Sequence, residues 1–560
     1  MKQVRFIKTI LNVAVLSSAG LMVACNSSDS AVATTSVSGY IVAAPVDGAE
    51  VNVVDVSGNV VAGPVNTDAA GKYTLTIPNS SLAQDLILKS SGGTFNDEAT
   101  GSSGTAGEMF AYVLADSLSS GSSVSATPGS TIVAQLVMNH NKTMTQAQEA
   151  FTNAFGYTPD ITITPADATG PAADATEASR LAGLRAAAFS QLAMDLGLLV
   201  TTPVAEQFYM FAALADDLSD GVLDGVGSSG SVAVGNTRKE LQLDIQSQFA
   251  NALVNFHDDG NEMYMGNDLS GLGSDQIGTV PFANVAITSD GKYKIKYIPG
   301  MMSAMEGKSS FKLLITDLND NPVNNLTPTL VPMMHMATMT HSSPKPVTSV
   351  LYDNAGDGMY TATVYYLMAS QMMDGMSMGY WDIKVDVDSD VVDTKDDVVH
   401  FYPPVMMAMG DTAQVRLKGV ADQVMAMGGG MEGRTYFIFK DSLMMAGMNT
   451  YNFTVFLAAK QDMMNFPAVY TGSTLSGAAL GSVLVEISDD DGVSWSDAID
   501  NGDGTFTLNS LTLTDGVEDQ IRVRLTVTDT TRTEMKTTDG ATAVVDTNDY
   551  QTFTVTPGGM

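Results

Sequence analysis

Cysteine is almost absent from this chain of 560 residues, because Cys25 is the only one. A single thiol forms no disulfide within its own chain and cannot build a cysteine-ligated zinc or iron–sulfur site. Histidine is also scarce, with five residues, and neither a His-Glu-x-x-His nor a Walker arrangement occurs. Hydrolytic or redox catalysis therefore has few candidate groups, and the sequence predicts a protein that is not an enzyme.

Basic residues are few as well, with 27 Lys and Arg against 62 Asp and Glu and a formal net charge of −35. A surface this acidic repels nucleic acid and attracts cations. Residues 489–492 and 500–504, Asp-Asp-Asp-Gly and Asp-Asn-Gly-Asp-Gly, look like fragments of calcium loops. The full EF-hand spacing is missing, so calcium is a weak expectation and Asx-Gly turns explain both segments more simply.

Methionine is the residue that the chain has in excess. Of its 35 methionines, 24 lie between Met301 and Met464, and the densest segment, residues 331–341, also carries two histidines. Thioether sulfur is a soft, uncharged ligand that selects Cu(I), and imidazole binds copper in both oxidation states. The sequence therefore predicts a copper site whose ligands come from two groups: Met333, Met334, His335, Met336, Met339 and His341, with Met372, Met373, Met376 and Met378 as further contributors.

The methionines also fit three roles that need no copper. Methionine is a flexible apolar filler, and this role is favoured for Met359 and Met368, which lie in strand-like patterns. Exposed methionines can also act as reversible oxidation sinks, since each cycles to the sulfoxide. A methionine-rich surface can, finally, re-pack against different partners and act as an adhesive face.

The N-terminus has the form of a targeting segment. Lys2, Arg5 and Lys8 precede a short apolar run at residues 10–21, and Met-Val-Ala-Cys at 22–25 resembles a bacterial lipobox. The resemblance implies a signal peptide at 1–24, acylation of Cys25 and attachment of the chain to the membrane through lipid, such as palmitate. Asn26 favours the outer membrane, on its periplasmic or cell-surface face. No later run approaches the ~20 apolar residues of a membrane-spanning helix.

The first half of the chain divides into a tether, a β module and a helical region. Residues 25–36 are rich in Ser and Ala and form a flexible tether. Short alternating runs between turn residues at 37–89 predict antiparallel strands and resemble the carboxypeptidase-regulatory-like (prealbumin-like) β-sandwich, assigned to 37–95. Apolar residues at three- and four-residue spacing then predict a helical spacer domain over 96–279, with helices near 131–138, 145–155, 175–199, 205–218 and 237–256.

The second half looks like one β architecture used twice, at 280–400 and 401–560. Residues 304–311 are echoed by 430–437, residues 353–361 by 500–507, and residues 380–387 by 520–527. Alternating strands with Gly and Asp turns predict two immunoglobulin-like β-sandwiches, with Trp381 in a core. The fold class is therefore multidomain and mainly β.

The first of these copies resembles the YtkA/FixH-like family of extracytoplasmic β-sandwiches. The resemblance rests on the Met/His strand at 333–341, the Asp-Gly-Met-Tyr turn at 357–360 and the Gly-Tyr-Trp strand at 379–381. The resemblance implies the sandwich fold and, because members of the family tend to handle copper, it also implies copper binding. The sequence thus predicts a lipid-anchored, non-catalytic protein of the cell envelope that sequesters Cu(I) or passes it to an envelope partner. A structural or adhesive surface lipoprotein, or an oxidant sink, is the alternative.

Overall fold

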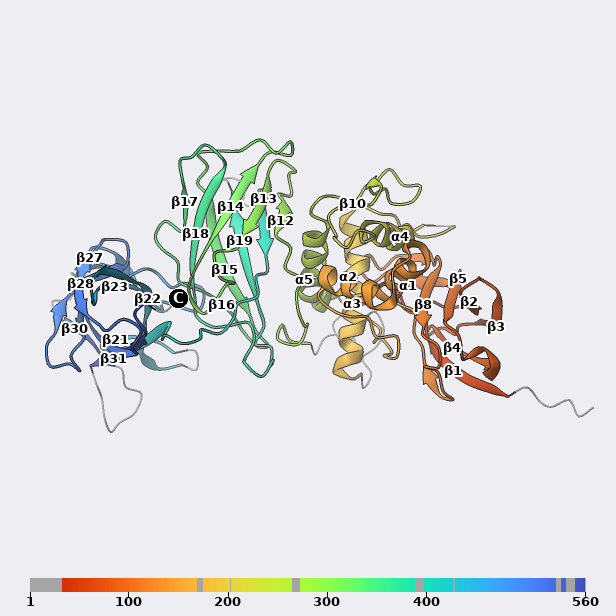
Figure 1. Ribbon diagram of the computed structural model, residues 1–560, viewed down its shortest axis with the longest axis horizontal. Helices are drawn as coiled ribbons and strands as arrows, with labels where there is room; N and C mark the ends of the chain where they lie inside the picture. The colour runs from red at the N-terminus through yellow and green to blue at the C-terminus, as the bar shows by residue number, and fades with distance from the viewer. Residues whose placement is uncertain are drawn as a thin grey trace, which may run out of the picture.

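The computed structural model describes residues 33–168, 175–201, 203–263, 272–387, 397–426, 429–529, 535–539 and 549–558. Within this part the chain is multidomain and mainly β, as predicted, and its parts follow one another along the longest axis (Figure 1). None of the helices described there is long and apolar enough to cross a bilayer. The signal peptide and Cys25 lie outside the described residues.

The N-terminal β module consists of two facing sheets, with strand orders β4-β1-β9 and β3-β2-β5-β8, and a separate hairpin of β6 and β7. Its strands are β1 (Thr34–Tyr40), β2 (Glu50–Asp55), β3 (Val60–Asn66), β4 (Lys72–Pro78), β5 (Leu86–Ser91), β6 (Thr94–Asn96), β7 (Ser103–Thr105), β8 (Met109–Val113) and β9 (Ser122–Ser123). Because β8 pairs with β5 and β9 with β1, the module runs to residue 123, whereas the sequence assigned it to 37–95.

In the described residues between 128 and 263, five α-helices form the helical body. They are α1 (Pro128–His140), α2 (Met144–Phe155), α3 (Glu177–Asp195), α4 (Gln207–Asp217) and α5 (Ile245–Met263), with a small hairpin of β10 (Val226–Gly227) and β11 (Gly230–Ser231) before α5. Thr127 and Ser130 form a capping box that fixes the start of α1. One continuous apolar core joins the β module to the helices, so the helical region is packed against its neighbour over a shared interior.

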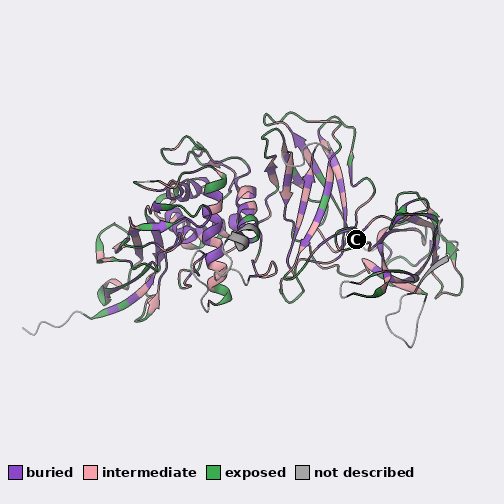
Figure 2. Cartoon of the chain, turned by 180° about the vertical axis from the view of Figure 1, so that it is seen from behind, coloured by how far each residue is buried: buried purple, intermediate pink, exposed green. Residues whose placement is uncertain are grey.

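The proximal sandwich (residues 285–401) contains two sheets with orders β12-β13-β14-β18-β17 and β16-β15-β19-β20. Its strands are β12 (Val285–Ile287), β13 (Lys294–Ile298), β14 (Gly307–Thr316), β15 (Thr329–His335), β16 (Thr340–Ser342), β17 (Val350–Tyr352), β18 (Met359–Tyr366), β19 (Tyr380–Asp386) and β20 (Val398–Phe401). The inward residues of both sheets are buried (Figure 2), and Trp381 lies in this core as predicted. The strand order is that of an immunoglobulin-like sandwich.

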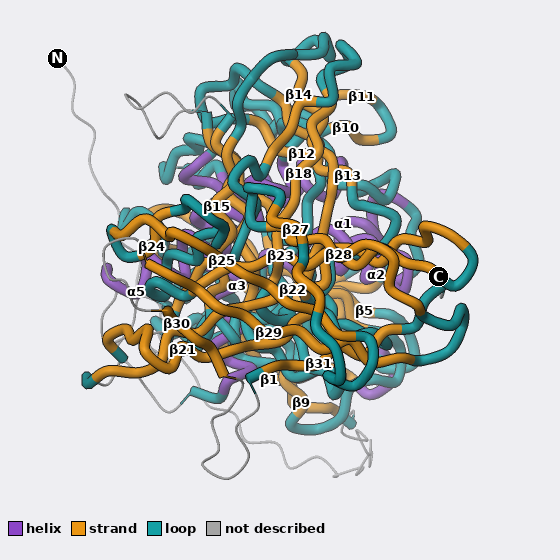
Figure 3. Tube along the Cα trace, turned by 90° about the vertical axis from the view of Figure 1, so that its left-hand side faces the viewer, coloured by secondary structure: helices purple, strands orange, loops and turns teal. Residues whose placement is uncertain are grey.

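The distal sandwich (residues 414–555) is nearest the viewer when the molecule is seen end-on (Figure 3). Its strands are β21 (Gln414–Met425), β22 (Met431–Gly447), β23 (Thr450–Ala459), β24 (Thr474–Leu475), β25 (Ala478–Ser488), β26 (Ser496–Asp497), β27 (Ile499–Asp500), β28 (Thr505–Thr512), β29 (Asp519–Asp529), β30 (Met535–Asp539) and β31 (Tyr550–Val555). In the described residues these strands form one continuous sheet, because β30 pairs with both β21 and β29. Within it, the order β21-β22-β23-β28-β27 repeats the first proximal sheet, and β25-β29-β31, with β26 beside β25, repeats the second.

This pairing order corrects one of the sequence echoes. The turn between β17 and β18 matches the turn between β27 and β28, and β19 matches β29, as residues 353–361 and 380–387 indicate. The echo of 304–311 by 430–437 fails, because the partner of β18 is β14 and the partner of β28 is β23, not β22. A short Gly-containing similarity at the start of a strand is therefore weaker evidence that two strands correspond than the similarity of a complete turn.

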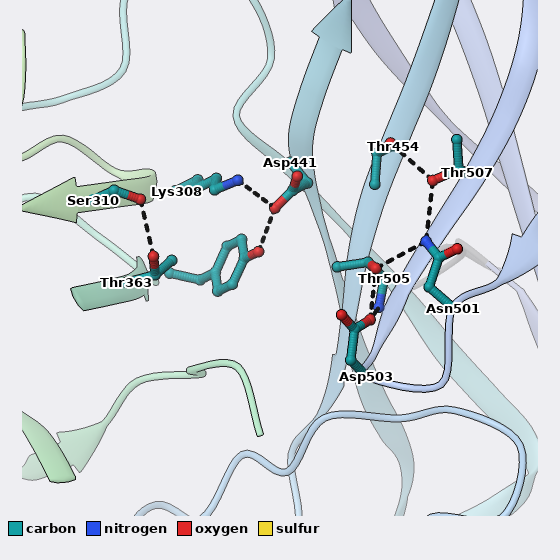
Figure 4. Close-up of polar contacts among 10 residues, drawn as sticks. Lys308, Ser310, Thr363, Asp441, Thr454, Asn501, Asp503, Thr505 and Thr507 are labelled. Carbon is teal, nitrogen blue, oxygen red and sulfur yellow. Dashed lines mark hydrogen bonds and ion pairs between the residues drawn. The ribbon is translucent and has the colours of Figure 1, made fainter. Parts of the chain in front are cut away.

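Aromatic and charged side chains join the two sandwiches. The ring of Tyr365 stacks on Phe456 with centroids 4.0 Å apart, and its hydroxyl donates to the carboxylate of Asp441. Lys308 reaches the same carboxylate from the proximal side, 2.7 Å away (Figure 4). The junction is therefore a packed interface and not merely a linker.

Candidate metal site

The strand register separates the predicted ligands onto two faces of one sheet. On the inner face, Met334 lies opposite His341 of β16 and Trp381 of β19. On the outer face, His335 lies opposite Tyr380 of β19. Since successive side chains of a strand point to opposite sides, the structure does not bring His335 together with Met334 and His341.

The inner-face group is enclosed by the core of the proximal sandwich. Met334 is fully buried, and the His341 ring stands edge-on to Trp381 with centroids 5.7 Å apart. His341 Nδ1 donates to the carbonyl oxygen of Ser342 over 2.8 Å, which leaves the Nε2 lone pair available to a metal. Burial lowers the pKa of His341, so the ring is neutral near pH 7. Further half-buried thioethers pack against the same core: Met336, Met368 and Met378.

The outer-face group belongs to the contact with the helical body. His335 stacks on Tyr380 with centroids 4.8 Å apart, and Tyr402 donates to Asn251 of α5 over 2.9 Å. His400 is 2.8 Å from Asp382 on the same face. Burial lowers the pKa of His335, although the Asp382 and Asp258 carboxylates oppose this effect. His335 therefore serves an interface between two parts of the chain.

The remaining predicted methionines lie at the end of the sandwich where the inner-face group sits. Met336 N–H donates to the carbonyl of Met339 and closes the turn between β15 and β16, and Met372 N–H donates to Met376 in the loop before β19. Gly379, at φ +126°, lets this loop lie against the carbonyl of His335, where any Cβ would clash. Several of these side chains are exposed: Met339, Met372, Met373 and Met376, with Met373 at 85%.

The structure adds a group of methionines that the sequence did not single out. A cleft of about 790 Å³ at the junction of the two sandwiches is lined by Met301, Met302, Met305 and Met409. Backbone pairing of Met305 with Met406, and of Ser342 N–H with the carbonyl of Met463, brings this cleft to the same end of the proximal sandwich. The methionine density of residues 301–464 was the available signal, but only the register could show which members gather.

Acidification should destabilise the proximal sandwich. The folded pKa values of His335 and His341 lie below the ordinary value of about 6.5, so the unfolded chain takes up protons first as the pH falls. The free energy of unfolding should therefore be steady above about pH 6.5 and decrease below it. Urea unfolding followed by Trp381 fluorescence in a Trp495→Phe background measures this. In the His335→Asn/His341→Asn variant, the decrease in the free energy of unfolding below about pH 6.5 should be smaller. An unchanged decrease would show that these two histidines do not cause it.

The remaining histidines and the acidic turns contribute no ligand cluster. His140 pairs with Asp216 over 3.0 Å, and His257 is buried beside Asp258, 2.8 Å away. The Asp500 and Asp503 carboxylates accept backbone N–H groups of Gly502 and Thr505, which is the geometry of Asx turns. Among the described residues, no three His, Cys, Asp or Glu side chains are placed to share a metal ion.

Two glycine patterns have the spacing of known motifs without their structural context. Residues 375–379 read Gly-Met-Ser-Met-Gly, the spacing of a hydrolase nucleophile turn, and 225–230 read Gly-Val-Gly-Ser-Ser-Gly, the spacing of a dinucleotide-binding loop. Both motifs require a helix directly after the turn. Here β19 follows the first pattern, and the second forms the β10–β11 hairpin, so neither pattern builds the site that its spacing suggests.

No family model and no curated protein matches the sequence. Among solved structures, the chain is similar to the Yersinia pseudotuberculosis adhesin InvE, with 15% sequence identity and a TM-score of 0.13. The match covers 44% of this chain and 60% of that chain. A TM-score this low carries no conclusion about function.

Proposed function

We propose that this protein is a lipid-anchored, extracytoplasmic and non-catalytic Cu(I)-binding protein. The observation that carries the proposal is the pairing of Met334 with His341 across β15 and β16, against Trp381. A neutral imidazole whose Nε2 is not used in the contact with Ser342, and several thioethers packed in or against the neighbouring core, form a ligand set suited to Cu(I). Attachment through Cys25, and an outer-membrane location, remain proposals from the N-terminal sequence.

The ligand set explains why a monovalent soft ion is favoured over a divalent one. Met334 and His341 supply no negative charge, and burying a divalent cation without carboxylates would carry a large desolvation penalty. Thioethers need no deprotonation, so only the share of the binding energy that comes from His341 falls at low pH. Met336 and Met378 would supply further thioethers to the site, since both pack against the core that contains Met334.

The exposed methionines suggest how the ion reaches this site. Met339 is exposed in the turn between β15 and β16, and Met372 and Met376 are exposed in the loop before β19. Thioethers at a protein surface can bind Cu(I) transiently. A partner carrying similar ligands could then exchange the ion at this end of the proximal sandwich. Sequestration and hand-off both follow from the same arrangement.

Titration of the full-length protein with Cu(I) against a competing chelator tests the proposal. We expect at least one ion to bind with a Kd below about 1 μM, which corresponds to about 8 kcal/mol. The Met334→Leu/His341→Ala variant should lose this site, whereas Met444→Leu/Met445→Leu, exposed at a distant hairpin of the distal sandwich, should retain it. Equal affinity in the two variants, or weaker binding by the unaltered protein, would refute the copper function.

A structural or adhesive surface protein is the second candidate. Its support is the succession of parts along one long axis, which would project the distal sandwich away from the N-terminal attachment (Figure 1). Methionines exposed on that distal sandwich, such as Met425, Met431 and Met448, would then serve as contact groups or oxidant sinks. Absence of Cu(I) binding, together with an unchanged attachment of cells to a surface in the Met334→Leu/His341→Ala variant, would favour this candidate.

A further inference from the structure

A second cleft, unrelated to the methionines, lies between the helical body and the proximal sandwich. It encloses about 900 Å³. One wall is the face of α5 that carries Gln248, Asn251 and Asn255, at the three- and four-residue spacing that places them on one side of a helix. The opposite wall is formed by β12, β19 and β20. Ligand sites occur preferentially at such boundaries between domains.

Two hydrogen bonds hold the walls together and so define the cleft. Asp244, just before α5, accepts the N–H of Ile287 of β12 over 3.0 Å, and Asn251 accepts from Tyr402 over 2.9 Å. The second Asp244 oxygen accepts from Gln248. Burial raises the pKa of Asp244, and both of its carboxyl oxygens are engaged at the contact between the walls.

Cations face the cleft from both sides. Arg238 and Lys239 come from the loop before α5, and Lys384 comes from β19. None of the three forms an ion pair within the described part of the chain. Three carboxyls share the lining with these cations: Asp244, the exposed Glu240, and Asp195, whose pKa burial raises and which accepts from Gln191.

The hydrogen-bonding and apolar groups of the lining restrict the kind of ligand. Asn255 offers an exposed amide, and His400 uses Nδ1 for Asp382, which leaves Nε2 open. The apolar part of the lining is aliphatic, with side chains such as Leu196 and Ile287, and it includes no Phe, Tyr or Trp ring. The cleft is also far larger than a single inorganic anion needs and lies near the upper end of the range for small-molecule sites, about 300–1,000 Å³.

From these observations we infer that this cleft binds an acidic oligosaccharide, a chain of sugars that carries carboxylate groups. Lys384 on one wall, and Arg238 with Lys239 on the other, pair with carboxylates at separate positions along the ligand. The amide of Asn255 and the imidazole of His400 hydrogen-bond to sugar hydroxyls. This binding site needs no copper and stands apart from the Cu(I) proposal.

Calorimetric titration of the full-length protein with trigalacturonate tests the inference. Maltotriose serves as the neutral ligand of similar size, and the buffer contains no divalent cations because these bind uronates. We expect trigalacturonate to bind at least about tenfold more tightly than maltotriose, and Lys384→Gln to weaken its binding by about tenfold or more. Lys312→Gln, an exposed lysine on the other sheet of the proximal sandwich, should leave the affinity unchanged.

Three results would each overturn the inference. The first is failure of trigalacturonate to bind at a concentration of about 10 mM, because a Kd above this value corresponds to a binding free energy of less than about 3 kcal/mol. The second is binding no tighter than that of maltotriose, and the third is equal affinity in Lys384→Gln and the unaltered protein. Arg238→Gln provides a second variant from the opposite wall, so that a folding defect in one variant does not decide the result.

Discussion

Replacing Trp381 with alanine should destabilise the proximal sandwich by about 3–5 kcal/mol, the usual range for removing a buried large aromatic side chain. Trp381 is fully buried, packs edge-on against Tyr366, and donates its indole N–H to the carbonyl of Met368 over 3.1 Å. Urea unfolding followed by far-UV circular dichroism should show the proximal transition shifted by about 1–2 M.

The matched control for this change is Trp381→Phe, which keeps an aromatic ring and removes only the indole hydrogen bond and part of the volume. It should cost less than half as much as alanine. Because Trp381 forms one side of the Met334 and His341 pocket, Cu(I) affinity should fall in the alanine variant and be largely retained in the phenylalanine variant. Equal stability of the alanine variant and the unaltered protein would show that the core does not depend on this ring.

Replacing Asp422 with alanine should have a comparable effect on the distal sandwich, again about 3–5 kcal/mol, because it leaves a buried cation unpaired. Asp422 and Arg434 are both almost fully buried, and the Arg434 Nε–H donates to the carboxylate over 2.7 Å. Tyr436 donates to the same oxygen over 2.6 Å. Thermal unfolding by calorimetry should show the distal transition at a clearly lower temperature.

Two controls distinguish an unpaired charge from a simple loss of contacts. The Asp422→Leu/Arg434→Met variant removes both charges and should be far closer in stability to the unaltered protein than Asp422→Ala is. Asp491→Ala breaks an ion pair with Arg522 in which the carboxylate side chain is 79% exposed, and it should cost no more than about 1 kcal/mol. A large loss in the double variant would show that the pair stabilises the fold through its own attraction.

Much of the fold was accessible from the sequence because strands and helices leave periodic apolar patterns. Alternation along residues 380–387 predicted β19 and the inward position of Trp381, and three- and four-residue spacing predicted all five helices of the helical body. The predicted ends of the helices were less accurate. The segment 237–244 was assigned to the last helix, but Asp244 is held by Ile287 and Gln248, and α5 begins only at Ile245.

The candidate site could be predicted only in part from the sequence. Alternation along a strand places Met334 and His335 on opposite faces, but the sequence cannot tell which face of the strand packs on the core when methionine occurs on both. The position of β16 beside β15 made His341 the partner of Met334. The cleft lined by Met301, Met305 and Met409 depends on how the two sandwiches meet, which no local pattern encodes.

By itself, the sequence determined the local chemistry: an acidic chain with one thiol, methionine concentrated in residues 301–464, and strand and helix periods that set its fold class. Tertiary structure alone decided which soft side chains meet, since register assigns Met334 and His341 to the core and His335 to the contact with α5. The reason is physical. Periodicity records how successive residues along a strand or helix alternate between the apolar core and polar solvent. A binding site depends instead on contacts between segments far apart in the chain, such as those that carry Lys384 and Arg238 on the two walls of one cleft.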